Sequence, residues 1–331
     1  MEYFGIDSDN KFLVPILYFM DPRQRVYWLY LLTSTVVAAA IYLIQRRSEA
    51  QGENSEQGLL EFLVPRSIVN HRSARTDYIY FVLNAILYSF ILAPFFFLYT
   101  VVSGRTFQAL AGYFGQEPPD QPASALATLA YTVCVALALD FSLFIAHYIF
   151  HRFPLLWQFH KVHHSAQVMT PMTVYRMHPV DDIVTISFTV VIGGLVDSFF
   201  RFFFMPNVTQ ITVWGLNLLI FVFYIVGYHL RHSHVWLSYG RRLSNVLISP
   251  AQHQIHHSKA AKHWDKNFGF MLAIWDRAFG TLYVPREKEQ LEFGIGEEEG
   301  EYSTVFQLYF TPFRKAYGIV RQRLRRILRA G

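Results

Sequence analysis

The chain has 331 residues, of which 53% are hydrophobic, 17% aromatic and only 16% charged, and its formal net charge is +5. Soluble domains are typically about 25% charged, so this composition argues against a soluble enzyme and favours a membrane protein. The single cysteine, Cys134, excludes an internal disulfide framework and a cysteine metal site. The N-terminus lacks the basic stretch of a cleaved leader, so we expect the first apolar run to be an uncleaved membrane anchor.

Five apolar segments follow in chain order, each about long enough to cross a bilayer core. They are Val26–Ile44, Tyr78–Val102, Ala125–Ala146, Ile183–Phe204 and Val208–Tyr228. Pro94 predicts a kink in the second segment. Only residues 205–207 separate the fourth from the fifth, which predicts a tight hairpin. Asp197 and Arg201 are one turn apart in the fourth segment, so we expect a structural ion pair there.

The distribution of arginine in the loops predicts the orientation in the membrane. Residues 45–77 contain five arginines, whereas residues 103–124 contain one. Basic loops face the cytoplasm, so five crossings would place the N-terminus outside and the C-terminus inside. Residues 147–182 and everything after residue 229 would then share the cytoplasmic face of a bacterial inner membrane or an endoplasmic reticulum membrane.

Histidine is unusually frequent, with 14 residues that fall mostly into clusters. The three main clusters are His147-x-x-x-His151, His160-x-x-His163-His164 and His253-x-x-His256-His257. Residues three and four apart share one face of a helix, whereas adjacent residues diverge by about 100°. One member of each adjacent pair can therefore face one metal while its neighbour faces a second. Eight histidines exceed what one tetrahedral metal uses, so two metals are the economical interpretation.

Other residues are less firmly indicated. His178 and His232 are probable further ligands, because they lie where the chain enters or leaves the membrane beside the clusters, while His229, His234 and His263 are left undecided. Asp140 lies two turns before His147, so we expect it to hydrogen-bond a ligating imidazole; the alternative is a buried carboxyl satisfied by a helix hydroxyl. Imidazole ligands alone do not distinguish zinc, copper, iron and nickel.

The motifs of residues 125–285 together resemble the fatty acid hydroxylase / sterol desaturase superfamily. In chain order they are Asp140-Phe141, His147-x-x-x-His151-Arg152, Leu156-Trp157-Gln158-Phe159-His160-Lys161-Val162-His163-His164-Ser165, Tyr175-Arg176-Met177-His178-Pro179, His232-Ser233-His234, Ser249-Pro250-x-x-His253-x-x-His256-His257-Ser258, His263-Trp264-Asp265-Lys266-Asn267-Phe268-Gly269 and Trp275-Asp276-Arg277-x-Phe279-Gly280-Thr281.

This resemblance implies an all-α, polytopic membrane protein with four to five membrane segments and a cytosolic helical cap that carries the histidines. It implies a non-haem di-iron centre that uses O2 and external electrons to hydroxylate or desaturate a lipid or sterol. The ligands carried over are His147, His151, His160, His163, His164, His253, His256 and His257, with His178 and His232 as additions. No His-Pro-Gly-Gly motif of a fused cytochrome b5 occurs, so electrons are expected from a separate donor of the ferredoxin or cytochrome b5 type with its reductase.

The chain is divided into three parts on this interpretation. Residues 1–124 form N-terminal membrane segments and loops, residues 125–285 form the catalytic domain, and residues 286–331 form an acidic loop and a basic tail. Between Arg314 and Arg329 seven basic residues alternate with apolar ones. This pattern predicts a helix lying on an anionic membrane surface rather than a contact with nucleic acid.

Two other classes of protein were weighed against an oxygenase. A zinc-dependent membrane hydrolase would need about three protein ligands and a glutamate base, and the chain has no His-Glu-x-x-His motif. A metal transporter or sensor would favour polar residues along the middle of the apolar segments, which are almost free of them. The substrate, the choice between hydroxylation and desaturation and the oligomeric state stay open.

Overall fold

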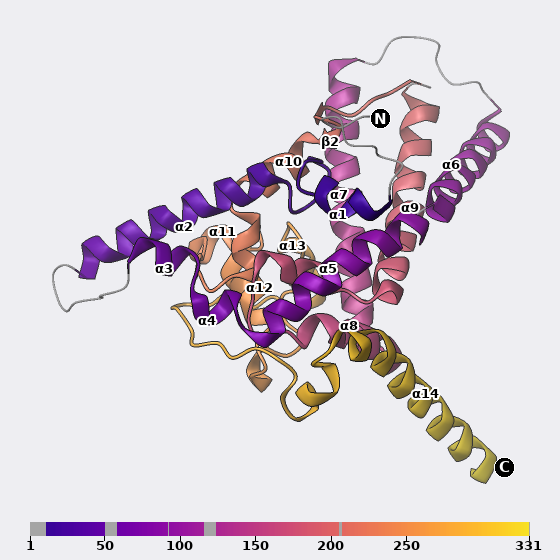
Figure 1. The fold of residues 1–331 in the computed structure, drawn as a ribbon. Coiled ribbons are helices and arrows are strands. Elements are labelled where there is room, and N and C mark those ends of the chain that lie inside the picture. The colour runs from indigo at the N-terminus through magenta and orange to yellow at the C-terminus, as the bar shows by residue number, and fades with distance from the viewer. Residues whose placement is uncertain (1–10, 50–57, 92, 116–123, 205–206, 331) are drawn as a thin grey trace.

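A computed structural model describes residues 11–49, 58–91, 93–115, 124–204 and 207–330. It is almost wholly helical, with one two-stranded antiparallel sheet, so the expected all-α class is confirmed (Figure 1). The α-helices are α1 (Val14–Leu17), α2 (Trp28–Glu49), α3 (Leu59–Leu63), α4 (Arg66–Val69), α5 (Arg72–Ile91), α6 (Ala93–Phe114), α7 (Ala125–Arg152), α8 (Pro154–His164), α9 (Pro179–Phe203), α10 (Leu218–Ile225), α11 (Gly240–Leu243), α12 (Pro250–His256), α13 (Ile274–Phe279) and α14 (Val305–Ala330). The shorter elements are the 3-10 helices η1 (Lys11–Leu13), η2 (Pro171–Tyr175), η3 (Tyr228–His232), η4 (Ala261–His263) and η5 (Gly296–Tyr302) and the strands β1 (Thr212–Val213) and β2 (Leu216–Asn217).

Three of the described helices are long and apolar enough to cross a membrane. They are α2 over Trp28–Arg47, α7 and α9, with mean hydropathies of 1.6, 2.1 and 2.0. The pair α5 and α6 adds a fourth span if it is counted as one helix bent by 47°. Pro94 lies in the first turn of α6, which agrees with the predicted kink. The ion pair in α9 is also present, because Arg201 Nε lies 2.9 Å from an Asp197 carboxylate oxygen.

The fifth apolar segment is not a membrane-spanning helix, and that expectation was wrong. After residue 207 the chain forms the short hairpin of β1 and β2, whose turn holds Trp214 and Gly215 at φ values of 48° and 81°. Asn217 then caps α10, which has only eight residues and is about 12 Å long. Gly227, at φ 83°, ends this run before η3. The apolar composition therefore serves packing against α2 and α7 instead of a crossing.

This correction removes the basis of the five-crossing topology. Residues 205–206, which were expected at the tip of the hairpin, lie outside the described residues. With three or four candidate spans, the number of crossings no longer places the two termini on opposite sides of the membrane.

The helices gather at the two ends of α7. Helix α9 packs against both α7 and α6, and these three helices stand together in the upper right of Figure 1. Helix α8 and the segment from α11 to α13 lie around the other end of α7 (Figure 1). Between them, Tyr30 of α2, Ala136 of α7 and Tyr224 of α10 share one buried core cluster with Phe270 from the loop before α13.

A buried ion pair holds the histidine end of the molecule together. Arg176 is almost fully buried, and its Nη1 donates to Asp77 Oδ1 of α5 at 2.6 Å. The same guanidinium donates to the carbonyl oxygens of Val162 in α8 and Tyr302 in η5. Arg176 therefore connects α8, which carries three clustered histidines, with α5 and with the segment that leads into α14.

Candidate metal centre

Four helical elements bring the clustered histidines to one place. His147 and His151 lie on the last two turns of α7, three histidines lie on α8, His232 ends η3, and the third cluster occupies α12 and its C-cap. Because α7 continues beyond its apolar stretch to Arg152, its final turns can present both imidazoles outside that stretch.

Local sequence explains how α8 and α12 begin where they do. Pro154 starts α8 directly after Phe153, so the chain turns back towards the end of α7 without a long loop. Helix α12 opens with Pro250 and a capping box, in which the Ser249 hydroxyl accepts from the Gln252 amide and the Gln252 side chain accepts from Ser249 N.

Nine histidines converge in two groups, each with one ring nitrogen per residue within 4.8 Å of the others. Group A contains His147, His151, His160, His164 and His256. Group B contains His163, His232, His253 and His257. The members of each adjacent pair fall into different groups, as their divergence of about 100° on a helix requires. The two groups touch, because the rings of His164 and His257 stack with centroids 4.7 Å apart.

The histidines of both groups are in the state that binds a metal. Burial lowers the pKa of His160 to about 3, and it holds the pKa values of His163, His164, His232, His253, His256 and His257 well below the usual value. A neutral imidazole offers a lone pair to a cation, whereas an imidazolium does not.

Group A also fits a metal because its Nε2 atoms lack hydrogen-bond partners. The Nε2 atoms of all five members are buried and have no hydrogen-bond partner: His147, His151, His160, His164 and His256. Unsatisfied buried polar atoms are rare and costly, and five that converge on one point are the arrangement that a cation would satisfy. In group B, His253 Nε2 lies 3.0 Å from His232 Nε2 and 3.2 Å from His257 Nε2, so these nitrogens also point at a common centre.

Oxygen acceptors on the outer side orient the imidazoles of group A. His147 Nδ1 lies 2.9 Å from the Phe268 carbonyl oxygen, and His256 Nδ1 lies 2.8 Å from that of Lys266. His160 Nδ1 lies 2.5 Å from Asp181 Oδ2. An acceptor at Nδ1 selects the tautomer that leaves Nε2 free to bind a metal. Within the described part of the chain, the ring nitrogens of group B have no such oxygen acceptor.

Two residues predicted for the site lie elsewhere. His178 is in neither group, because its Nδ1 accepts from Val180 N and its Nε2 donates to the Tyr309 carbonyl oxygen. Asp140 accepts from Met271 N, Leu272 N and Trp275 Nε1, so its partners are residues of the loop and helix around 271–275 and not an imidazole. This carboxyl therefore positions the segment that follows Phe268.

The three undecided histidines also lie outside the two groups. His229 Nε2 donates to the Arg25 carbonyl oxygen, His234 Nε2 donates to that of Phe62, and His263 pairs with Glu289. The residue that sequence reasoning missed is Asp181, which contacts His160 across 21 positions. Its only sequence signal was a pair of carboxyl groups in the first turn of an apolar helix.

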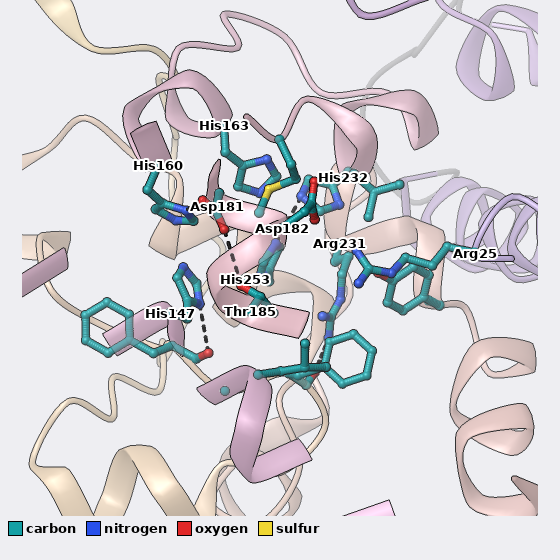
Figure 2. A pocket seen from close by; sticks show the side chains of 17 residues that line it. Arg25, His147, His160, His163, Asp181, Asp182, Thr185, Arg231, His232 and His253 are labelled. Atoms are coloured by element: carbon teal, nitrogen blue, oxygen red, sulfur yellow. Dashed lines mark hydrogen bonds and ion pairs between the residues drawn. The ribbon is translucent and has the colours of Figure 1, made fainter. Parts of the chain in front are cut away.

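The histidine groups separate two cavities. The smaller, of about 90 Å³, is lined by histidines of both groups together with Leu143 of α7 and Thr185 of α9 (Figure 2). The larger, of about 620 Å³, lies on the side of α12 and η5 and is lined by Trp157, Lys161, Lys259 and Glu298 among others. The centre is thus reached from two sides, one next to α7 and α9 and the other next to α12 and η5.

Comparisons with known proteins agree with this architecture. A sequence model of the fatty acid hydroxylase family matches residues 132–281. The chain is 28% identical over 174 residues to the ornithine lipid hydroxylase OlsE of Rhizobium tropici, and the aligned region covers 50% of this chain and 46% of that protein. It is 30% identical over 172 residues to an alkylglycerol monooxygenase of Danio rerio, covering 50% and 34%. It is 23% identical over 205 residues to a fatty acid hydroxylase of a Lecanicillium species, covering 55% and 51%.

These matches confirm that residues 132–281 resemble the fatty acid hydroxylase superfamily. The chain spans about half, or less, of the length of these relatives. No solved structure shows a significant match.

Proposed function

We propose that this protein is a membrane-bound non-haem di-iron oxygenase that hydroxylates an alkyl C–H position of a lipid, using O2 and electrons from a separate donor. The observation that carries the proposal is the convergence of nine histidines, seven buried and two half-buried, into two adjoining groups; five of the nine have an unpartnered Nε2. Group A would hold one iron and group B the other. The two irons, when bound, would supply the O2 activation that cleavage of an unactivated C–H bond needs.

The chain itself would bind and orient the reactants. Phe268 and Phe270, with Leu143, form apolar walls of the smaller cavity, which would exclude water from the reacting carbon. Asp181 would hold the His160 ring in place through Nδ1, and the carbonyl oxygens of Phe268 and Lys266 would do the same for His147 and His256.

The substrate we propose is a polar lipid, and the reaction is hydroxylation. The names of the relatives describe hydroxylases of an ornithine lipid and of a fatty acid and a monooxygenase of alkylglycerol. These names favour hydroxylation over desaturation and a lipid with a polar headgroup over a sterol.

The side of the centre that the larger cavity opens on suits a separate electron donor. Trp264 is 65% exposed and lines the larger cavity together with Lys259, while Trp157 lies in contact with the His151 and His164 rings. A donor docked at this face would be separated from group A only by aromatic and histidine side chains.

We also propose that the histidine end faces the cytoplasm and that α14 lies on the membrane surface. The exposed apolar side chains of α14 recur every three or four residues and form one stripe: Phe306, Phe310, Phe313, Tyr317, Val320, Leu324, Ile327 and Leu328. Arg314, Arg321 and Arg325 border this stripe, which suits an interfacial helix on anionic lipid. The five arginines of residues 45–77 also favour a cytoplasmic position for the loop between α2 and α5.

The two alternative functions have less support. A zinc hydrolase would use about three ligands with an open position and a carboxylate base beside it, whereas nine histidines occupy this centre. A transporter would need a metal path between the spans, but the clustered histidines gather at one end of α7.

The test is isotopic labelling of lipids by the iron-loaded protein. The protein in membranes is supplied with ¹⁸O2 and a reduced ferredoxin, and lipids are compared by mass spectrometry with those from a His163→Ala variant. We expect one ¹⁸O atom in a lipid product of the wild type only. A product labelled from water, or products that are identical in both samples, would overturn the proposal.

A further inference from the structure

The smaller cavity beside both histidine groups is more charged than an alkyl chain alone would require. Four charged side chains line it, namely Arg25, Arg231, Asp181 and Asp182. Figure 2 shows Arg25 and Arg231 on the same side of the cavity as His232 and His253. A site for a methylene in the middle of a long chain would be lined by apolar residues instead.

The two carboxyl groups already have partners. Asp181 contacts His160 Nδ1 at 2.5 Å, and Asp182 accepts from the Tyr88 hydroxyl of α5. Their direct hydrogen bonds are therefore made to α8 and α5.

Neither arginine is in direct ion-pair contact with a carboxylate, and Asp181 and Asp182 act on Arg25 only at longer range. Arg231 is only 3% exposed, and its Nη2 donates to the Phe270 carbonyl oxygen at 2.7 Å. Its guanidinium lies 4.9–5.4 Å from the ring centroids of Phe223, Tyr228 and Phe270. Arg25 lies 5.9 Å from the Phe270 centroid. Among the described residues, no carboxylate oxygen lies within 4.0 Å of either guanidinium.

A buried guanidinium without an anion is costly, and aromatic faces compensate for only part of that cost. Histidine binds a metal as a neutral imidazole, so divalent ions held by group B would add positive charge that their ligands do not balance. The positive charge on this side of the cavity, directly beside group B, is therefore not balanced by an anion in direct contact.

We propose that Arg25 and Arg231 bind the acidic group, a carboxylate or a phosphate, of the substrate's headgroup. Planar guanidinium groups bind both kinds of oxyanion in a bidentate manner. Because the same small cavity is lined by His147, His160 and His163, the oxidised carbon lies within a few bonds of that headgroup and not far along the acyl chain. This inference rests on the proposed function for its substrate class, but it concerns a binding site that can be tested without iron.

The test measures lipid binding to the metal-free, full-length protein in a neutral detergent. N-decanoylglycine is compared with uncharged N-decanoylglycinamide, and decanoylglycerol phosphate is compared with decanoylglycerol. We expect at least one acidic probe to bind about tenfold more tightly than its neutral counterpart, as a charge-assisted hydrogen bond would provide. The pair that shows the preference identifies a carboxylate or a phosphate.

Variants decide whether the arginines are responsible. Arg231→Gln and Arg25→Gln should each remove the preference and leave the binding of the neutral probes unchanged. Arg231→Lys should retain part of it, and the exposed Arg242→Gln on α11 serves as the matched control. Equal binding of acidic and neutral probes to the wild type would overturn the inference, as would a preference that survives both glutamine variants. Equal weakening of acidic and neutral probes by Arg231→Gln would show a structural role only. Lipid oxidation by the iron-loaded protein could persist in each of these cases, so failure here is distinguishable from failure of the proposed function.

Discussion

The two histidine groups differ in how the protein supports them. Group A has oxygen acceptors behind His147, His160 and His256, and all five of its Nε2 atoms lack partners. Group B has no such acceptors among the described residues, and its Nε2 atoms contact one another. Outer hydrogen bonds fix the ring and raise the basicity of the ligand, so group A should bind its metal more tightly and group B should exchange its metal more readily.

The largest effect is expected from loss of a ligand in either group. His256→Ala in group A and His163→Ala in group B should each lower lipid oxidation by more than about 100-fold, which exceeds the effect of losing an outer partner. Product formation is measured in membranes that contain equal amounts of inserted protein. His178→Ala is the matched control, because His178 lies outside both groups. If His163→Ala kept full activity, the assignment of group B would be wrong.

Loss of the buried ion pair between Arg176 and Asp77, which connects α8 with α5, should affect both histidine groups together. Arg176→Ala would leave Asp77 buried without its partner, which typically costs about 3–5 kcal/mol. We expect a clearly lower temperature of thermal inactivation and equal loss of metal from both groups. The exposed Arg242→Ala should have the stability of the wild type. An unchanged inactivation temperature for Arg176→Ala would contradict the role given to this ion pair.

Loss of an outer partner should affect one group only. Asp181→Asn removes the carboxylate behind His160 and should weaken iron binding at group A by about 10- to 100-fold, with group B unchanged. Iron affinity is measured by anaerobic titration with a competing chelator. Asp182→Asn is the control from the same turn of α9, since Asp182 contacts Tyr88 instead of a histidine. Equal iron affinities in the two variants would show that the carboxylate behind His160 does not support metal binding at group A.

The smallest effect concerns the C-terminal part of α14, which extends away from the contact of this helix with α8. Arg321→Gln combined with Arg325→Gln should weaken its contact with anionic lipid, because each basic residue contributes about 1 kcal/mol near such a surface. Amide exchange over residues 317–329 is measured in nanodiscs of anionic or zwitterionic lipid. We expect protection in anionic lipid that falls on the order of tenfold in the variant. Exchange that is independent of lipid charge would show that α14 does not bind the membrane surface.

Helical periodicity accounts for the part of the site that could be predicted. The split of His163 from His164, and of His256 from His257, follows from the angle between neighbours on a helix. His178 was assigned from its position beside an apolar segment, but its imidazole instead caps α9 and binds the Tyr309 carbonyl. Periodicity cannot predict whether His178 binds a metal or a carbonyl oxygen, because that depends on how α14 packs.

Contacts between distant segments explain the rest. The pairing of Asp181 with His160 forms only after the chain reverses through η2, so no local pattern indicates it. The fifth apolar segment was misread because hydropathy counts apolar side chains and does not register the turn at Trp214 and Gly215. The kink near Pro94 was predicted because proline acts locally on its own helix.

The most direct test of two irons in two histidine groups is the metal content of anaerobically prepared protein. We expect about two irons per chain in the wild type and about one in His253→Ala, which alters group B alone. Oxygen uptake should accompany lipid oxidation only in the protein with both irons. A stable single zinc per chain, with no oxygen consumption after iron loading, would contradict the account and favour a hydrolase.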